Sequence, residues 1–160
     1  MPDAITNTSP LVYLHRIEML DWIPHIFSSV WVPQQVLAEL DEGRSRGYDV
    51  PTQEHLPWAD IVEPQHMPSE WFALDLGMGE VAAMALALEN WERVVILDDL
   101  LARRTDQAAG LHVWGTLRIL LEAKAIGLTS EVRPHVEQLR ASGMYLSNDV
   151  KQRILQLAGE

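Results

Sequence analysis

Apolar residues along the chain follow two patterns, short unbroken runs and longer stretches with helical spacing. The short runs predict strands in AITNTSP (4–10, a strand running into a turn), SSVWVP (28–33), ADIVEP (59–64), RVVILDD (93–99) and LHVWG (111–115). The longer stretches predict helices over residues 11–23, 34–43, 80–91, 101–110, 116–127, 130–143 and 147–160. Prolines 10 and 33 suit the start of the first two helices, and glycines 43, 127 and 143 suit helix ends.

Strands that alternate with helices predict an α/β fold with a mostly parallel sheet. We expect one domain over residues 1–160, with extra C-terminal helices from about residue 116. The loosest stretch, residues 43–70, holds several prolines and glycines, but it is too rich in apolar residues for an interdomain linker. A five-stranded sheet of order 3-2-1-4-5 would place the first and fourth strands side by side.

Composition excludes several classes of protein. With 160 residues, 48% of them hydrophobic and 22% charged, the chain is expected to fold rather than remain disordered. The absence of cysteine excludes disulfides, thiolate zinc sites and a cysteine nucleophile. No apolar run is long enough to span a bilayer, and the first residues lack the basic start of a signal peptide. These features fit a cytoplasmic protein.

Charge is unevenly distributed along the chain. The net charge is −11, from 12 basic and 23 acidic residues. Residues 1–92 hold three bases and fifteen acids, whereas residues 93–160 hold nine bases and eight acids. An acidic surface repels nucleic acid at long range, so any nucleic-acid contact is expected from the second part of the chain. Acidity that serves only solubility is the alternative.

Polar side chains follow the first and fourth predicted strands. Asn7 is succeeded by Thr8 and Ser9, and Asp98 is followed by Asp99. Ligands of open parallel sheets bind at the carboxyl ends of the strands, where the strand order reverses. We therefore expect these side chains to share one ligand.

Two acidic residues on predicted helices border apolar faces. Glu39 follows Val36 by three residues, and Glu80 precedes Ala83 and Met84 on an apolar face. Carboxylates that converge repel one another unless a cation neutralises them, and all-oxygen ligands suit Mg²⁺ or Mn²⁺.

Each of these residues also has a purely structural interpretation. Glu80 can complement a helix dipole, and Glu39 can be a solvated helix acid. Asp98 can cap the helix that follows it, with Asp99 in its first turn, and Asn7 can form an Asx turn. The convergence of the whole set on one sheet edge favours the metal site over these alternatives.

The strings ITNTSPLVYL, VPQQVLAEL, LGMGEVAAMALA, VVILDDLLARR and GLHVWGTLRILLEAKAIGL resemble the PIN domain over nearly the whole chain, from Ile5 to Glu160. More narrowly, they resemble a VapC-toxin-like branch of that family. The resemblance implies a three-layer α/β/α sandwich and a metal-dependent ribonuclease of the toxin–antitoxin type. It further implies RNA as substrate, Mg²⁺ or Mn²⁺ as cofactor and a small antitoxin as partner.

The resemblance also assigns roles to residues. It places the catalytic, metal-binding group at Asn7, Glu39, Glu80 and Asp98 or Asp99. Asn7 departs from the family's aspartate and brings no charge, so we expect weaker metal binding than in an all-acid site. Residues expected near the substrate are Ser9, Arg103, Arg104 and Thr116. The two arginines are equally compatible with being solvated helix residues or pairing with Asp99 and Asp106. For Thr116, the N-cap of the next helix is favoured over a contact to water or phosphate.

Three other functions compete with the nuclease. A PIN-like module that binds nucleic acid or protein without cutting fits both the net charge and Asn7. A phosphoacceptor receiver domain has its acid pair after the first strand rather than the fourth, and a phosphate-binding NTPase needs a GxxxxGK segment that is absent. Trp58 and Trp71 lie in the irregular stretch, where they either pack on the core or mark an interface, for instance of a homodimer.

Overall fold

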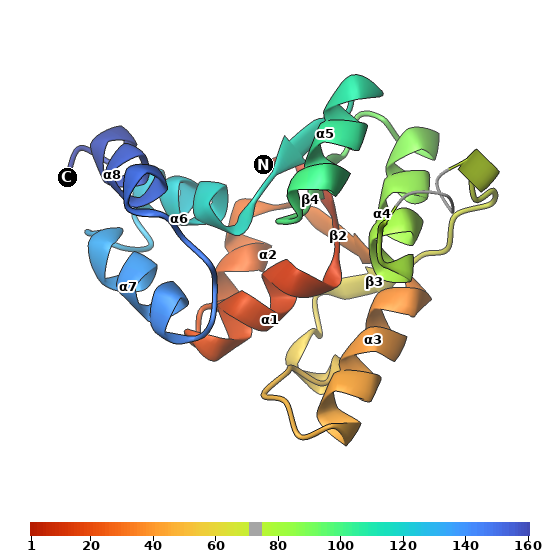
Figure 1. The fold of residues 1–160 in the computed structure, drawn as a ribbon, viewed down its shortest axis with the longest axis horizontal. Coiled ribbons are helices and arrows are strands. Elements are labelled where there is room, and N and C mark those ends of the chain that lie inside the picture. The colour runs from red at the N-terminus through yellow and green to blue at the C-terminus, as the bar shows by residue number, and fades with distance from the viewer. Residues whose placement is uncertain (71–74) are drawn as a thin grey trace.

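A computed structural model describes residues 1–70 and 75–160. Strands and helices alternate up to the fifth strand, after which the chain continues as helices (Figure 1). The elements in chain order are β1 (Asp3–Thr6), α1 (Thr8–Arg16), η1 (Leu20–Trp22), α2 (Ile23–Ile26), β2 (Ser29–Val32), α3 (Gln34–Ser45), η2 (Gln53–His55), β3 (Ala59–Ile61), α4 (Met78–Glu89), β4 (Val94–Ile96), α5 (Leu100–Ala108), β5 (His112–Trp114), α6 (Thr116–Ala125), α7 (Arg133–Ala141) and α8 (Asn148–Leu157).

The five strands form one sheet of order β3-β2-β1-β4-β5, and every neighbouring pair is parallel. Ala4 of β1 lies opposite Val30 of β2 and Val94 of β4, which fixes the register at the centre. The predicted fold class and strand order are confirmed. The strand order reverses between β1 and β4, so the carboxyl ends of these two strands define the edge where a ligand is expected.

Alternate residues of the strands point to opposite faces of the sheet, and each face carries its own core. On one face Ala4 and Ile96 pack with residues of α1, α2, α3, α6 and α7. On the other face Ile5 and Val95 pack with α4 and α5. The three layers predicted for the chain are therefore present. Residues of α4 from Val81 to Ala87 are all buried, because small alanines let this helix approach the sheet closely.

Two predicted helix boundaries are wrong. The helix expected over residues 11–23 ends at Arg16, because Glu18 adopts a left-handed conformation (φ 61°) and the chain then continues as η1 and α2. The helix expected to end at Gly43 runs through that glycine to Ser45. The turn after α3 falls instead at Gly47, whose φ of 85° suits a residue without a side chain.

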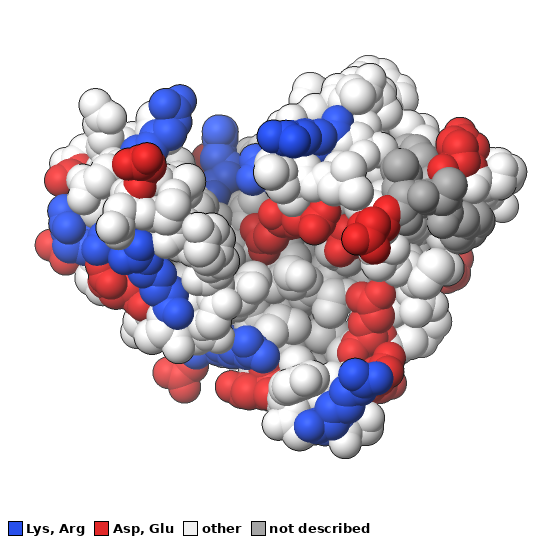
Figure 2. All heavy atoms as spheres, viewed as in Figure 1, with Lys and Arg blue, Asp and Glu red and all other residues white. Residues whose placement is uncertain are grey.

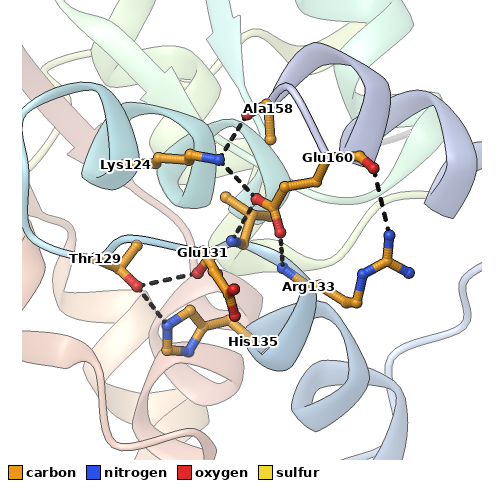
Figure 3. A network of polar contacts seen from close by, with 8 residues as sticks. Lys124, Thr129, Glu131, Arg133, His135, Ala158 and Glu160 are labelled. Atoms are coloured by element: carbon orange, nitrogen blue, oxygen red, sulfur yellow. Dashed lines mark hydrogen bonds and ion pairs between the residues drawn. The ribbon is translucent and has the colours of Figure 1, made fainter.

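The C-terminal helices are tied together by the carboxylate of Glu160 (Figure 3). It accepts hydrogen bonds from the backbone N–H groups of Val132 (2.7 Å) and Arg133 (3.1 Å), at the start of α7. It also accepts one from Nζ of Lys124 on α6, at 3.0 Å. A negative charge at the N-terminus of α7 complements its helix dipole. Glu160, which follows the end of α8, therefore connects α6 and α7 through these hydrogen bonds.

Trp58 is half-buried and packs on the core that contains α1 and α3. Of its two predicted placements, on the core or at an interface, the structure shows the first. Trp71 lies outside the described residues. Every helix in the described part of the chain is too short or too polar to span a bilayer.

Candidate functional site

The carboxyl ends of β1, β4 and β5 meet at one edge of the sheet. Strand pairing continues past the ends of these strands, since the N–H of Asn7 donates to the carbonyl of Ile96 (3.1 Å) and the N–H of Leu97 donates to that of Trp114 (2.9 Å). These bonds place Asn7, Asp98 and the start of α6 beside one another.

Asp98 is held by the first residue of α6. Its Oδ1 accepts the backbone N–H of Thr116 at 2.8 Å, and its Oδ2 accepts the Thr116 hydroxyl at 2.7 Å. Burial raises the pKa of Asp98, while these two hydrogen bonds and the positive charge of Arg103 lower it. The prediction that Thr116 caps α6 is wrong, because the cap position is Gly115 and the Thr116 side chain binds Asp98 instead.

Asp99 is the residue that caps α5. Its Oδ1 accepts the N–H of Ala102 at 2.9 Å, as a helix N-cap does. The structural alternative in which Asp98 is the cap is therefore wrong by one residue. This division leaves Asp98 facing the β5–α6 junction while Asp99 lies exposed beside it.

Glu80 lies in the first turn of α4, and its Oε2 is buried without a hydrogen-bond partner among the described residues. Burial is the main cause that raises the pKa of Glu80 to about 7. The negative charges of Asp99, Glu39 and Asp75 raise it further, while the backbone N–H of Gly77 opposes them. Glu80 therefore does more than complement a helix dipole, because the negative charges of the other acids of the site repel its carboxylate.

Glu39 is a structural partner of α4 rather than a solvated acid. Its Oε1 accepts the N–H of Gly79 (2.7 Å), and its Oε2 accepts the hydroxyl of Thr8 (2.5 Å). A Cβ on Gly79 would lie 2.5 Å from Oε2 of Glu39, so a larger residue at this position would displace the Glu39 carboxylate. Sequence reasoning missed the role of Gly79, although the glycine one residue before Glu80 was visible in LGMGE.

Asn7 is buried, with 2% of its surface exposed. It occupies the N-cap position of α1, but its side chain makes no capping hydrogen bond, so the predicted Asx turn is absent. Its Oδ1 has no partner among residues 1–70 and 75–160. A buried acceptor without a donor costs free energy, which a bound ligand would recover.

A cleft of about 820 Å³ opens beside these residues. Five of the residues expected at the site line it, namely Ser9, Glu80, Asp98, Asp99 and Arg103. Figure 2 shows acidic side chains in the central hollow and basic side chains toward its margins. Of the two arginines on α5, Arg103 lines the cleft, whereas Arg104 is exposed and does not belong to the lining. Neither pairs with Asp99 or Asp106 in the described part of the chain.

The cleft is also lined by residues that the sequence patterns did not single out. Tyr13 of α1 faces it, and the pKa of Tyr13 is raised by burial and by the charge of Asp98. Gly115 lies so close to Asp98 that an added Cβ would come within 3.2 Å of its Oδ1. No spacing rule identifies these residues, because their proximity depends on how β5 meets α6.

The donor set suits a hard divalent cation. Asn7 Oδ1 and Glu80 Oε2 are buried oxygens without donors, and the acids around Glu80 raise its pKa by repulsion. A cation relieves both conditions. In the described residues, however, no three Asp, Glu or His side chains are already grouped to enclose an ion. The oxygens of Glu39 and Asp98 are directed to protein N–H and hydroxyl groups instead.

Two comparisons with known proteins give matches. A family model described as a PIN domain matches residues 3–160. Among solved structures, the fold is similar to that of a PilT N-terminus domain protein from the hyperthermophilic archaeon Sulfolobus solfataricus P2, with a TM-score of 0.51 and 11% sequence identity. The match covers 91% of this chain and 98% of that one. A search of curated proteins finds no match.

Proposed function

The chain belongs to the PIN domain family, whose members are in general nucleases that depend on divalent metal ions, and we propose from this premise that it is a ribonuclease that uses Mg²⁺ or Mn²⁺. The reaction is hydrolysis of RNA phosphodiester bonds inside a strand. The observation that carries this proposal is the pair of buried, unpartnered oxygens, Asn7 Oδ1 and Glu80 Oε2, at the edge where the strand order reverses.

The residues proposed to hold the cation are Asn7, Glu39, Glu80, Asp98 and Asp99. When bound, a divalent cation supplies Lewis acidity and neutralises charge that develops on the phosphate. Asp98 is kept oriented by the Thr116 backbone and hydroxyl, and Glu39 is kept oriented by Gly79 and Thr8. The polypeptide thus positions its acids through neighbouring donors.

Substrate contacts are proposed for Ser9 and Arg103, which line the cleft together with the acids. The Arg103 guanidinium lies close to Asp98 and carries a charge suited to a phosphate oxygen. Thr116 acts through Asp98 and is a positioning residue. Arg104 remains a candidate only for parts of the RNA beyond the cleft.

We also place the protein among toxins that a small antitoxin neutralises, on the basis of its resemblance to the VapC-like branch. A basic or amphipathic antitoxin segment would complement the acidic cleft. Self-association is a further proposal, supported by the exposed indole of Trp91. Size measurement of the purified chain, alone and after co-expression with a neighbouring gene product, tests both partners.

A second candidate is a PIN-like module that binds without cutting. It is favoured by Asn7, which brings an amide where an acid would add charge, and by the absence of a preformed cage in the described residues. This candidate predicts RNA or protein binding without hydrolysis under any divalent cation.

The experiment that separates the two candidates is cleavage of labelled single-stranded RNA in Mg²⁺, Mn²⁺ or EDTA. We expect cleavage only with metal, and an increase in melting temperature on adding Mn²⁺. Glu80→Gln, purified in the same way, excludes a contaminating nuclease, and Glu131→Gln removes the same charge from an exposed loop as a matched control. Cleavage in EDTA, or equal cleavage by Glu80→Gln, contradicts the proposed function.

A further inference from the structure

The cleft has two unlike walls. All its acidic residues, Glu80, Asp98 and Asp99, lie on the side of α4 and the β4–α5 junction. The opposite wall is built from α6, the loop before α8 and α8 itself. Within the described residues that line it, this wall contains two arginines, one tyrosine, one serine and several apolar side chains, but no acid. In Figure 2, basic side chains lie at the margins of the hollow over α5 as well as over the C-terminal helices.

Tyr145 is the most exposed large side chain of the second wall, with 91% of its surface accessible. The chain on both sides of it is nevertheless fixed. The N–H of Met144 donates to the carbonyl of Leu139 at 3.0 Å, and the carbonyl of Leu146 accepts from the guanidinium of Arg140 at 2.8 Å. Leu146 is itself buried in the core. The phenol is therefore presented by an anchored segment, and packing within the chain does not account for its position.

Two arginines flank this tyrosine on the same wall. Arg118 of α6 is exposed, and its guanidinium lies 4.8 Å from the centre of the Trp114 ring. Arg153 of α8 is also exposed and lines the cleft. Among residues 1–70 and 75–160, neither guanidinium group forms a hydrogen bond or an ion pair. In a chain with 23 acidic and 12 basic residues, guanidinium groups without a carboxylate partner are available for an external anion.

We propose that Tyr145, Arg118 and Arg153 form the single-strand-binding wall of the cleft, with Tyr145 stacking on an unpaired base and the arginines holding backbone phosphates. This inference rests on the proposed function and specifies how the RNA lies. Aromatic rings alternate with cationic groups in sites that bind single strands, because every base offers a stacking face and every linkage a charge. The acids repel phosphates, and the second wall adds to Arg103 the positive charge that attracts RNA to them.

Binding of a labelled single-stranded RNA in EDTA, followed by fluorescence anisotropy, tests the wall separately from hydrolysis. We expect Tyr145→Ala to weaken binding by about 5- to 150-fold, the range of one lost stacking interaction, and Tyr145→Phe to keep the affinity within about twofold. Tyr48→Ala removes an exposed tyrosine outside the cleft and is the matched control.

Salt dependence tests the two arginines. Arg118→Gln and Arg153→Gln should each lower the slope of log affinity against log salt by about 0.7, whereas Arg46→Gln, which removes a charge at the C-cap of α3, should leave it unchanged. Unaltered binding by Tyr145→Ala, or an equal loss in Tyr145→Phe, overturns the stacking role. If the wild type cleaves RNA with metal while none of these variants changes binding, this inference fails and the proposed function stands. Wall-dependent binding without cleavage refutes hydrolysis and supports the wall.

Discussion

The two ends of α5 carry buried carboxyls in opposite circumstances. Asp98, just before the helix, is surrounded by the Thr116 N–H, the Thr116 hydroxyl and the charge of Arg103. Asp106, in the last turn, has no exposed surface, and neither of its oxygens has a hydrogen-bond partner in the described part of the chain. Burial raises the pKa of both groups, and it alone raises that of Asp106 to about 7.

The difference shows what a site must add to burial in order to stabilise the charged form of a carboxyl group. Donors at Thr116 stabilise the anion of Asp98, and the N-terminal end of α5 adds the positive end of a helix dipole. Asp106 has no donors and lies at the negative end of the same dipole. A raised pKa therefore marks a ligand site only when other charged or polar groups surround the carboxyl, as the acids around Glu80 and the donors around Asp98 do and as none does at Asp106 in the described part of the chain.

Asp98→Asn is expected to have the largest effect among the substitutions that test this comparison. The amide keeps its shape and both contacts, because its oxygen accepts the Thr116 N–H and its nitrogen donates to the hydroxyl. We expect the fold to survive, stabilisation by Mn²⁺ to disappear and RNA cleavage to fall by about 1,000-fold, or about 4 kcal/mol of transition-state stabilisation. Circular dichroism checks the fold, and unchanged cleavage contradicts the assignment of Asp98.

Asp106→Asn tests the other end of the helix. The folded-state pKa of Asp106 is about 7 and its ordinary value is 3.8, so the folded protein binds this proton more tightly than the unfolded chain. The contribution of Asp106 to the free energy of unfolding is thus greatest below about pH 4 and is lost as pH rises to about 7. The asparagine cannot ionise, and we expect it to stabilise the protein by about 2–4 kcal/mol at pH 8 and by little at pH 4.

Urea unfolding at the two pH values measures this difference, and cleavage activity is the second readout. We expect Asp106→Asn to cleave RNA at the wild-type rate, because Asp106 does not line the cleft. An equal effect of the substitution on stability at pH 4 and pH 8 would show that Asp106 is not a raised-pKa group.

Much of this contrast lies beyond sequence patterns. Periodicity predicted the strands, their order and the position of Asp98 at a strand end, because apolar runs and sheet topology are local or general properties. It did not distinguish Asp98 from Asp99 as the helix cap, since both residues precede the same helix. Asp106 was considered only as a partner for nearby arginines. Its burial depends on how α5 packs against the sheet, which no spacing along the helix reveals.

Thr116→Val sharpens the comparison by removing one donor from Asp98 while keeping the backbone N–H. A hydrogen bond to a charged group contributes about 1.5–3 kcal/mol, so the pKa of Asp98 should rise. We expect the acidic limb of the pH–rate profile to shift upward by roughly one pH unit or more. Thr105→Val is the matched control. It also removes a threonine hydroxyl, but that hydroxyl donates to the carbonyl of Leu101 within α5 and not to Asp98. A shift of equal size in both variants contradicts the positioning role of Thr116.

Asn7→Asp would give the site a carboxyl group that, like that of Asp106, is buried and has no hydrogen-bond donor in the described part of the chain. The new group would be as buried as Asn7 and would face no protein donor in the described residues. A proton or a cation can relieve the buried charge, so we expect lower stability than wild type in EDTA at neutral pH and about tenfold tighter Mn²⁺ binding by isothermal titration. Unfolding curves with and without Mn²⁺ should reverse the stability order of the two proteins. Weaker Mn²⁺ binding than wild type would show that Asn7 Oδ1 does not bind a metal. Asn7 would then be, like Asp106, a buried polar group without a ligand.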